Sequence, residues 1–438
     1  MVPIPIGRGC NITETLFPCK IFYVAVFLLE PLTCEQTIGM LTIGLIRESK
    51  TPADNRVAFT PTQCKWIIKN WSGVQVLVQS STNRCFSDKE YRNAGATVTD
   101  DMSSCNILFG IKEVNVEELI PNKTYLFFSH TKKAQAHNQK LMRAMVENEI
   151  TLIDYECLTH DDGQRMIGFG FFAGVVGAHN GMMAFGNRTG AFHLGRVGDV
   201  RDYRQLIHTY FGLKLPKIKI AITGSGRVAH GLLEIMNLLG VNEVEPFDYL
   251  HRTYEYPVYV HLKGRDLYER KDDGTYNRDN FHEHPEEYKC SFAPFVKQTD
   301  ILLNGVYWDK TIPPLFTLDE FRNTSFNIQT IADITNDTGG SIPVNIGDST
   351  IADPVYGVDK ITLQKTAPYL STSVDVMAVG NLPNELPRDA SRYFGEQLIK
   401  YVLDDLVKGG SPILERATIL KAGTLTEEYS YLKEYAGV

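Results

Sequence analysis

The stretch IAITGSGRVAHGLLEIMNLLG (residues 220–240) decides the fold class. An apolar run meets Gly-Ser-Gly and continues into a segment whose apolar residues recur at helical spacing. Gly224, Gly226 and Ala229 give the pattern G-x-G-x-x-A, in which glycines let the backbone approach a pyrophosphate at a helix N-terminus. The same pattern also occurs in tight strand-to-helix turns that bind nothing, so its context decides. The candidate cofactor contacts here are Gly224, Ser225, Gly226, Arg227 and Val228.

An acid placed about 20 residues after the glycines supports the dinucleotide interpretation. Asp248 has this spacing, and we expect it at the end of the next strand, where a carboxylate bonds the ribose hydroxyls of NAD. A carboxylate there repels the 2′-phosphate of NADP. The cations that follow it, His251 and Arg252, could accept that phosphate. We therefore predict NAD as the cofactor, with NADP possible.

Strand-like and helix-like segments alternate along most of the chain, as in parallel βαβ units. Expected strands cover 41–48, 74–81, 106–113, 124–130 and 151–158, with helices over 60–71, 87–96 and 134–149. A Gly- and Ala-rich helix over 168–190 has small residues that let two helices approach closely or let one helix connect the two lobes. A second set of strands covers 217–223, 241–250, 300–308 and 328–335, and the polar stretch 254–290 is expected to be an insertion outside the core. The fold class is α/β, with two Rossmann-like lobes, parallel sheets and an interlobe cleft.

Composition excludes several classes of protein. The 438 residues suggest two domains, and the formal net charge of −8 argues against nucleic acid, which needs a concentrated basic face. The eight cysteines show no zinc-like spacing and indicate a reduced, cytoplasmic protein without a metal. The apolar run IFYVAVFLL (21–29) is too short to cross a bilayer. Residues 1–39 are interpreted as a leader or a misassigned start.

Polar side chains follow the expected strands of the first lobe. Arg56, Lys112 and His130 each come at or after such a strand, and ligands bind at the carboxyl ends of parallel strands. A partly desolvated Lys beside other cations has a lowered pKa and can act as a base, His titrates near neutrality, and Arg grips carboxylates. Lys132, Lys133, Asp154, Glu156 and Arg165 lie close by in the sequence. Each residue alone also fits a solvated or structural role, but together they favour an amino-acid oxidoreductase.

At this point the sequence resembles a known family. The carrying motifs are RESKTPADNRVAFTP (47–61), GIKE (110–113), FFSHTKKAQ (127–135), LIDYE (152–156), ILLNGVYWD (301–309), ADITNDTGGSI (332–342) and NLPNELPRDAS (381–391). They resemble the lysine-forming saccharopine dehydrogenases and the lysine–ketoglutarate reductase half of the bifunctional lysine-degrading enzyme, with alanine dehydrogenase as a more distant relative. The resemblance implies a substrate lobe over 40–168, an NAD-binding lobe over 169–385, and a C-terminal segment, 386–438, that returns to the first lobe.

The resemblance also implies roles for individual residues. Lys112 matches the general base for the secondary amine and His130 the acid–base residue of the carbinolamine steps. Arg56 matches a substrate-carboxylate contact, and Lys133, Glu156 and Arg165 are further candidates for substrate binding. Asp337 matches an acid near the nicotinamide, and Asp333, Asn381 and Leu382 are the other candidate cofactor contacts. One departure is Gly380, where the family commonly has Asp.

The activity implied is reversible oxidation of saccharopine by NAD and water to lysine and 2-oxoglutarate. Two alternatives stay open: an alanine dehydrogenase-type enzyme, and a catalytically silent NAD-binding regulatory protein, which the missing acid at Gly380 would suit. The expected partner is a small amino-acid substrate, with no nucleic acid and no membrane. The chain is expected to be a monomer or a homo-oligomer.

Overall fold

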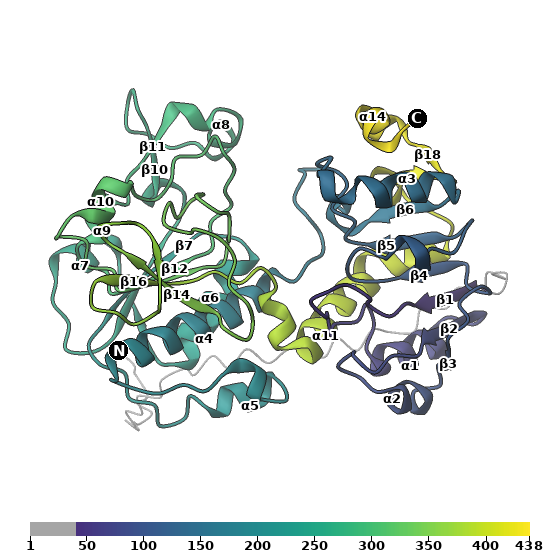
Figure 1. Cartoon of the computed structure of the whole chain (residues 1–438), viewed down its shortest axis with the longest axis horizontal. Helices are drawn as coiled ribbons and strands as arrows, with labels where there is room; N and C mark the ends of the chain where they lie inside the picture. The colour runs from purple at the N-terminus through teal and green to yellow at the C-terminus, as the bar shows by residue number, and fades with distance from the viewer. Residues whose placement is uncertain (1–40) are drawn as a thin grey trace, which may run out of the picture. The chain divides into compact units, whose positions relative to one another are not determined.

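The computed structural model describes residues 41–438, so the interpretation of residues 1–39 lies outside the described residues. The first lobe is built on an eight-stranded sheet (Figure 1). Its spatial order is β18 (Thr424–Leu425), β17 (Thr418–Lys421), β6 (Thr151–Asp154), β5 (Thr124–Phe127), β4 (Ile107–Phe109), β1 (Leu41–Leu45), β2 (Val74–Gln79) and β3 (Thr97–Thr99). The strands from β6 to β3 are parallel, whereas β17 pairs antiparallel with β6. The parallel sheet of the prediction is therefore confirmed.

Two of the three helices predicted for this lobe begin at the predicted residues, whereas the one expected over 134–149 begins as an α-helix only at Gln139. In α1 (Pro61–Asn70), the Thr60 hydroxyl accepts the backbone N–H of Gln63, whose side-chain carbonyl accepts the N–H of Thr60 at 2.8 Å. This reciprocal capping satisfies two donors that a helix start leaves free. The other helices around this sheet are α2 (Asp88–Asn93), α3 (Gln139–Glu147), α11 (Pro387–Leu398), α12 (Asp404–Val407), α13 (Pro412–Ala417) and α14 (Lys433–Ala436).

The second lobe holds another eight-stranded sheet. Its spatial order is β15 (Lys365–Thr366), β14 (Val355–Asp359), β16 (Ser373–Met377), β13 (Thr330–Asp333), β12 (Ile301–Asn304), β7 (Lys219–Thr223), β9 (Val258–Leu262) and β8 (Asn242–Glu243). The run from β16 to β8 is parallel. Its helices are α4 (Gly170–Thr189), α5 (Tyr203–His208), α6 (Arg227–Leu238), α7 (Pro246–His251), α8 (Arg278–Glu283), α9 (Ala293–Val296) and α10 (Leu318–Arg322). The prediction of two Rossmann-like lobes is confirmed, while the cleft between them stays a prediction.

The small residues of α4 do bring two helices together. A Cβ added to Gly174 would lie 2.0 Å from the Val228 carbonyl oxygen of α6, and one on Gly231 would lie 2.1 Å from the Phe171 carbonyl oxygen of α4. Any side chain at either position would separate the helices. The close approach places α4 against the helix that follows the glycine turn.

Two expectations for the second lobe are wrong. The segment expected as a strand over 241–250 forms the two-residue strand β8 and the helix α7. The stretch 254–290 is not wholly an insertion, because Val258–Leu262 forms the strand β9 beside β7. The remainder of that stretch forms α8 and the two-stranded sheet of β10 (Tyr268–Arg270) and β11 (Tyr288–Cys290).

The C-terminal residues complete the first lobe. Strands β17 and β18 extend its sheet beyond β6, and Phe394, Leu398 and Leu432 are buried in its hydrophobic core. Figure 1 shows α14, coloured yellow, beside α3.

Candidate active site

Four titratable side chains form a row beyond the carboxyl ends of four adjacent strands. Glu48, Lys112 and His130 each lie three residues beyond the end of β1, β4 and β5, and Glu156 lies two residues beyond β6. Leu45 of β1 pairs with Phe109 of β4, so these ends share one edge of the sheet. The row contains Lys112 and His130 side by side, as the sequence predicts.

Lys112 is partly buried and lies near charges of both signs. Burial lowers its pKa below the ordinary 10.5, and the Arg56 guanidinium lowers it further, while Asp54 and Glu113 oppose the shift. Lowering favours the neutral amine, which is the form that accepts a proton. The backbone N–H of Lys112 donates to Glu48 Oε2 at 2.9 Å, and that of Ile111 donates to Glu48 Oε1 at 2.6 Å. Glu48 therefore fixes the loop that carries Lys112.

Glu48 was not among the candidate residues, although it lies in the motif RESK. Burial and, to a smaller extent, the Asp54 carboxylate raise its pKa to about 8, against the effect of the two N–H donors. Glu48 is the third residue after the end of β1, just as Lys112 is the third after β4 and His130 the third after β5. That common offset is the sequence signal that could have found it.

His130 lies between Lys112 and Glu156. Its Nδ1 is 3.8 Å from Glu156 Oε2, and Arg165 Nη2 is 2.7 Å from Glu156 Oε1. Burial lowers the pKa of His130 below its ordinary 6.5, and the Lys112 ammonium lowers it further, while Glu113 and Glu156 oppose the change. A neutral imidazole at pH 7 can accept a proton. The geometry thus joins His130, Glu156 and Arg165 in one chain of contacts.

Asp154 supports this chain from beneath. The buried carboxylate accepts the Ser129 hydroxyl, the Ser129 N–H at 3.1 Å and the Glu156 N–H at 2.7 Å. Burial raises its pKa to about 6, although these hydrogen bonds lower it. One carboxylate thereby fixes the loop of His130 and the turn of Glu156.

Arg56 differs from its expected arrangement. It is 3 % exposed, its Nε and Nη2 donate to Asp54 at 2.9 and 2.6 Å, and its guanidinium lies 4.2 Å from the centre of the Phe169 ring. Burial would raise the pKa of Asp54, but Arg56 lowers it to about 2. The bidentate grip that suggested a substrate carboxylate is therefore made with Asp54, a residue that the sequence analysis missed. Substrate contact by Arg56 stays a prediction.

The glycine turn has the geometry that a pyrophosphate needs. Gly224 has φ +104°, and a Cβ on it would lie 2.4 Å from the Gly305 carbonyl oxygen. A Cβ on Gly226 would meet nothing within 4 Å. Gly226 precedes α6 without a side-chain cap, and the first N–H groups of a helix have no partner within it. Gly224 is thus required by the protein, whereas the open space beside Gly226 and exposed Ser225 fits a bound phosphate.

Two residues of the turn have other contacts. The Arg227 side chain donates to the carbonyl oxygens of Arg165, Met166 and Ile167, at 2.9, 3.2 and 3.4 Å. It therefore holds the segment leading into α4 instead of pointing to a phosphate. Val228 Cγ1 lies 2.8 Å from the Cβ position of Gly305, so its side chain packs within the protein.

Asp248 is misplaced in the prediction. It lies in α7 and pairs with Arg252 at 3.1 Å, while the strand beside β7 is β9. Lys219, at the start of β7, donates to the Arg252 carbonyl oxygen at 2.9 Å, so the end of α7 lies at the amino end of β7. The glycine turn follows the opposite end. Lys263 and Arg265 are the residues that follow β9 there.

Asp333 and Leu382 are buried, at 0 % and 2 % exposure. Asp333 accepts hydrogen bonds from the side chains of Asn304 and Asn345, at 2.9 and 2.8 Å, and burial raises its pKa to about 6. Its expected cofactor contact is replaced by these protein donors. The Leu382 side chain lies in the core of the second lobe, so it cannot be a side-chain contact to the cofactor.

Asn381 and Asp337 each interact with a residue of the first lobe. Asn381 Nδ2 donates to Asp54 Oδ2 at 3.1 Å. Burial raises the pKa of Asp337, and the Lys133 ammonium lowers it. A Cβ on Gly380 would lie 3.5 Å from Oδ2 of Asp348. Asp348, from another loop, therefore places a carboxylate beside the position at which the family commonly has Asp.

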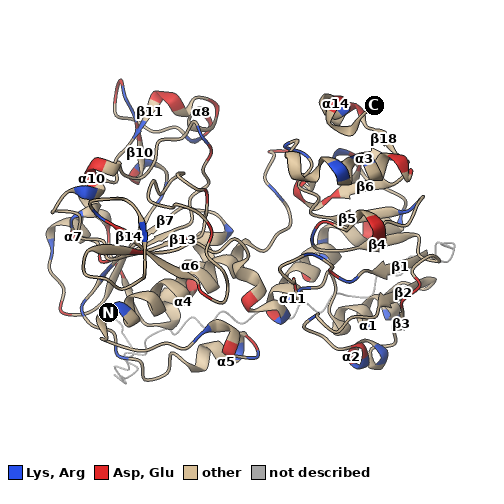
Figure 2. Cartoon of the chain, viewed as in Figure 1, with Lys and Arg blue, Asp and Glu red and all other residues tan. Residues whose placement is uncertain are grey.

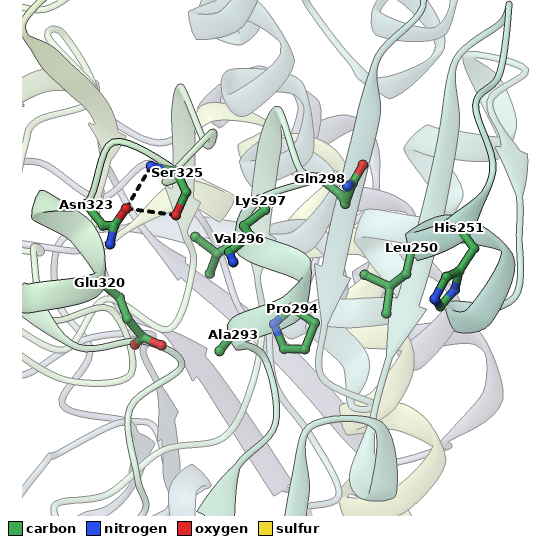
Figure 3. A pocket seen from close by; sticks show the side chains of 10 residues that line it. All are labelled: Leu250, His251, Ala293, Pro294, Val296, Lys297, Gln298, Glu320, Asn323 and Ser325. Carbon is green, nitrogen blue, oxygen red and sulfur yellow. Dashed lines mark hydrogen bonds between the residues drawn. The ribbon is translucent and has the colours of Figure 1, made fainter.

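One pocket lies elsewhere. Its volume is about 610 Å³. Figure 3 shows its lining, which includes His251, Lys297 and Gln298. Lys219 Nζ at the start of β7 lies 3.4 Å from Gln298 Oε1. The pocket is therefore at the amino ends of the strands, away from the glycine turn.

Other features of residues 41–438 bear on the remaining predictions. Figure 2 shows Lys and Arg interspersed with Asp and Glu, for example on α2, α5 and α10. Over this range no helix combines the length and apolarity that a membrane crossing requires, and no three His, Cys, Asp or Glu residues are grouped as metal ligands. Cys64, Cys85, Cys105, Cys157 and Cys290 are free thiols. The cytoplasmic location, the absence of nucleic acid and the oligomeric state stay predictions.

The comparisons with known proteins agree with this geometry. Residues 44–176 match the family described as alanine dehydrogenase/PNT, N-terminal domain. The chain is 31 % identical to the mitochondrial alpha-aminoadipic semialdehyde synthase of Rattus norvegicus, over 90 % of this chain and 47 % of that protein. It therefore spans about half the length of that relative. It is 27 % identical to a saccharopine dehydrogenase [NAD(+), L-lysine-forming] of Emericella nidulans, over 84 % of this chain and 92 % of that one.

Solved structures show the same fold. An L-alanine dehydrogenase aligns with a TM-score of 0.61 at 16 % identity, covering 90 % of this chain and 99 % of its own. The transhydrogenase from Sinorhizobium meliloti aligns with a TM-score of 0.57 at 14 % identity, covering 88 % of this chain and all of its own. With the motifs and the row of strand-end residues, these similarities confirm the predicted resemblance: the chain is similar to saccharopine dehydrogenases and alpha-aminoadipic semialdehyde synthases, and it shares the fold of an alanine dehydrogenase.

Proposed function

We propose that this chain is a nicotinamide-nucleotide-dependent oxidoreductase that interconverts saccharopine and water with lysine and 2-oxoglutarate. The observation that carries the proposal is the row of Glu48, Lys112, His130 and Glu156 at one sheet edge. It combines Lys112, whose pKa is lowered, with the neutral imidazole of His130. Oxidation of a secondary amine and hydrolysis of the resulting imine require two such proton carriers. The names of the relatives supply the substrate class.

Each side chain has a defined task in this scheme. A nicotinamide nucleotide held at the turn of Gly224 and Gly226 would supply the acceptor for the hydride of the glutaryl carbon attached to nitrogen. Lys112 takes the proton from the amine nitrogen. His130 takes a proton from the water that adds to the imine carbon and delivers one to the departing lysine nitrogen. Glu156 holds His130, and Arg165 and Lys133 bind the substrate carboxylates.

For the nucleotide we propose NADP(H) in preference to NAD(H), which reverses the order expected from Asp248. The N–H of Gly224 donates to the Leu262 carbonyl oxygen at 3.1 Å, so the end of β9 adjoins the glycine turn. Exposed Lys263 and Arg265 follow at the place where an acid would bind ribose hydroxyls. Asp266 Oδ2 accepts the Lys263 N–H at 3.3 Å and thus turns toward the backbone. Two cations there suit a 2′-phosphate.

The test is a set of parallel assays of nicotinamide absorbance with the purified chain. The expected result is oxidation of NADPH that needs both lysine and 2-oxoglutarate, with a lower rate for NADH. Pyruvate with ammonia is the matched arm for an alanine dehydrogenase-type enzyme. Turnover of pyruvate with ammonia, combined with no turnover of lysine with 2-oxoglutarate, would contradict the proposal. Tight nucleotide binding without turnover of any substrate would contradict it as well.

A further inference from the structure

A tight turn directly after His130 carries two lysines. The Ala134 N–H donates to the Thr131 carbonyl oxygen at 2.9 Å, which closes the turn and leaves Lys132 and Lys133 at its corners. His130 and Ala134 have φ values of +52° and +49°. This left-handed region is unfavourable for residues with a Cβ, so surrounding contacts must maintain it.

Contacts from the neighbouring part of the lobe hold the start of this segment, at Ser129 and Thr131. Asp154 fixes Ser129, and Asn138 Nδ2 donates to the Ser129 carbonyl oxygen at 3.2 Å. The centre of the turn is held from the C-terminus of the chain. The Tyr431 hydroxyl donates to the Lys132 carbonyl oxygen at 2.8 Å, and the Tyr435 hydroxyl donates to the Gln135 carbonyl oxygen at 2.7 Å.

These two hydrogen bonds lie on either side of Lys133. The Lys132 carbonyl belongs to the peptide group whose nitrogen is that of Lys133, and Gln135 lies two residues further on. Fixing both carbonyls restricts the backbone dihedrals of Lys133 and Ala134. The direction in which the exposed Lys133 side chain leaves the turn is thereby set by two tyrosines about 300 residues away in the sequence.

The C-terminal segment is itself firmly anchored. The 3-10 helix Glu427–Leu432 and α14 bury Leu432, Tyr435 and Ala436 in the core of the first lobe. The Tyr429 hydroxyl donates to the Arg416 carbonyl oxygen at 2.7 Å. Because the segment is packed and bonded, it can determine the position of an exposed turn.

We propose that the C-terminal segment 427–438 is part of the substrate site, with Tyr431 and Tyr435 as positioning residues that hold Lys133 toward a substrate carboxylate. This inference rests on the proposed function. The turn directly follows His130 of the proposed site, and the Lys133 ammonium is near enough to Asp337 of the second lobe to lower the pKa of that carboxyl. Neither tyrosine was a candidate from the sequence.

The test uses Tyr431→Phe, Tyr435→Phe and the double variant, which remove only the hydroxyl oxygens. We expect the KM for 2-oxoglutarate to rise about 5-fold for each change, because each change removes one hydrogen bond. The KM for NADPH and kcat should be nearly unchanged. Tyr256→Phe, an exposed tyrosine of the second lobe, is the matched control. An unchanged KM for 2-oxoglutarate in the double variant would overturn the inference.

A double-mutant cycle with Lys133→Ala separates positioning from a general structural effect. If the tyrosines act through Lys133, the double tyrosine change adds nothing to the KM of Lys133→Ala; if they only stabilise the fold, the two effects multiply. Multiplication would overturn the inference. Hydrogen exchange of the amides of residues 132–136 tests the positioning whatever the substrate, and exchange unchanged by the double variant would refute it. A wild-type chain inactive with lysine and 2-oxoglutarate would refute the proposed function instead.

Discussion

The carboxylate of Glu48 accepts the backbone N–H of Lys112 across the ends of β1 and β4, at 2.9 Å. Glu48, which follows β1, thus holds the loop that follows β4. The adjoining strands β5 and β6 bring His130 and Glu156 to the same edge of the sheet. Parallel strands make such a row possible because their carboxyl ends coincide. The row is therefore a consequence of topology, and it explains why residues from four separate motifs can act on one substrate.

Replacing the proton carriers should reduce turnover without loss of nucleotide binding. We expect Lys112→Met or His130→Gln to lower kcat about 10²- to 10⁴-fold, the usual contribution of a general acid or base. The Kd of NADPH, measured by fluorescence titration, should stay the same because the glycine turn lies in the other lobe. Full rates in both variants would show that the roles are assigned wrongly.

The pH dependence of saccharopine oxidation should report Lys112. The amine must be neutral to accept a proton, so the rate rises as the pH rises through the pKa of Lys112. Because burial and Arg56 lower that pKa, the rate should level off below pH 10.5. A pH profile of kcat/KM checks this, with Lys112→Met as the variant that lacks the rise. A rise that persists in Lys112→Met would assign it to another group.

The two glycines of the turn should respond differently to alanine. Gly224→Ala adds a Cβ 2.4 Å from a carbonyl oxygen at φ +104°, and we expect a clear fall in melting temperature. Gly226→Ala enters open space at φ −86°, so the fold should be unaffected while NADPH binding weakens at least 10-fold. Equal effects of both changes on stability would indicate that Gly226 serves the fold and not a ligand.

Much of this arrangement follows from the sequence, and the exceptions have physical causes. Lys112 and His130 could be placed because each closely follows a strongly apolar strand. Asp248 could not be placed correctly from its spacing. The chain forms two short elements, β8 and α7, before it reaches β9, the strand that pairs with β7. The pairing of Arg56 with Asp54 occurs in a loop, where no periodicity shows which partner an arginine takes. The side chain of Arg227 was misjudged because a motif fixes the backbone of a turn and not where its side chains point.

The buried ion pair of Asp54 and Arg56 should be important for stability. Asp54→Asn leaves the guanidinium without its partner, and we expect a loss of about 3 kcal/mol in the free energy of unfolding, measured with urea at pH 7. The native pKa of Asp54 is about 2, below its ordinary 3.8, so its contribution is complete above pH 3.8 and declines as the pH falls toward 2. The difference between wild type and variant should narrow over that range. A constant difference would argue against the ion pair.

Nucleotide preference should depend on the residues after β9. We expect Lys263→Ala and Arg265→Ala to lower kcat/KM for NADPH about 10-fold each, while values for NADH change less than 2-fold, because only NADPH carries the 2′-phosphate. Arg252→Ala, in α7, is the control. If Arg252→Ala shifts the preference and the other two do not, the original placement of the ribose site at Asp248 was correct.

The proposed function requires Lys112 and His130 to meet the reacting atoms of a substrate held against a nucleotide on the glycine turn. The most direct measurement is a crystal structure of the chain with NADP and saccharopine bound. The account predicts the saccharopine amine within about 3 Å of Lys112 Nζ, His130 on the side of the oxidised carbon, and the pyrophosphate over Gly226. A saccharopine molecule bound away from this row, or a pyrophosphate elsewhere than at the start of α6, would contradict it.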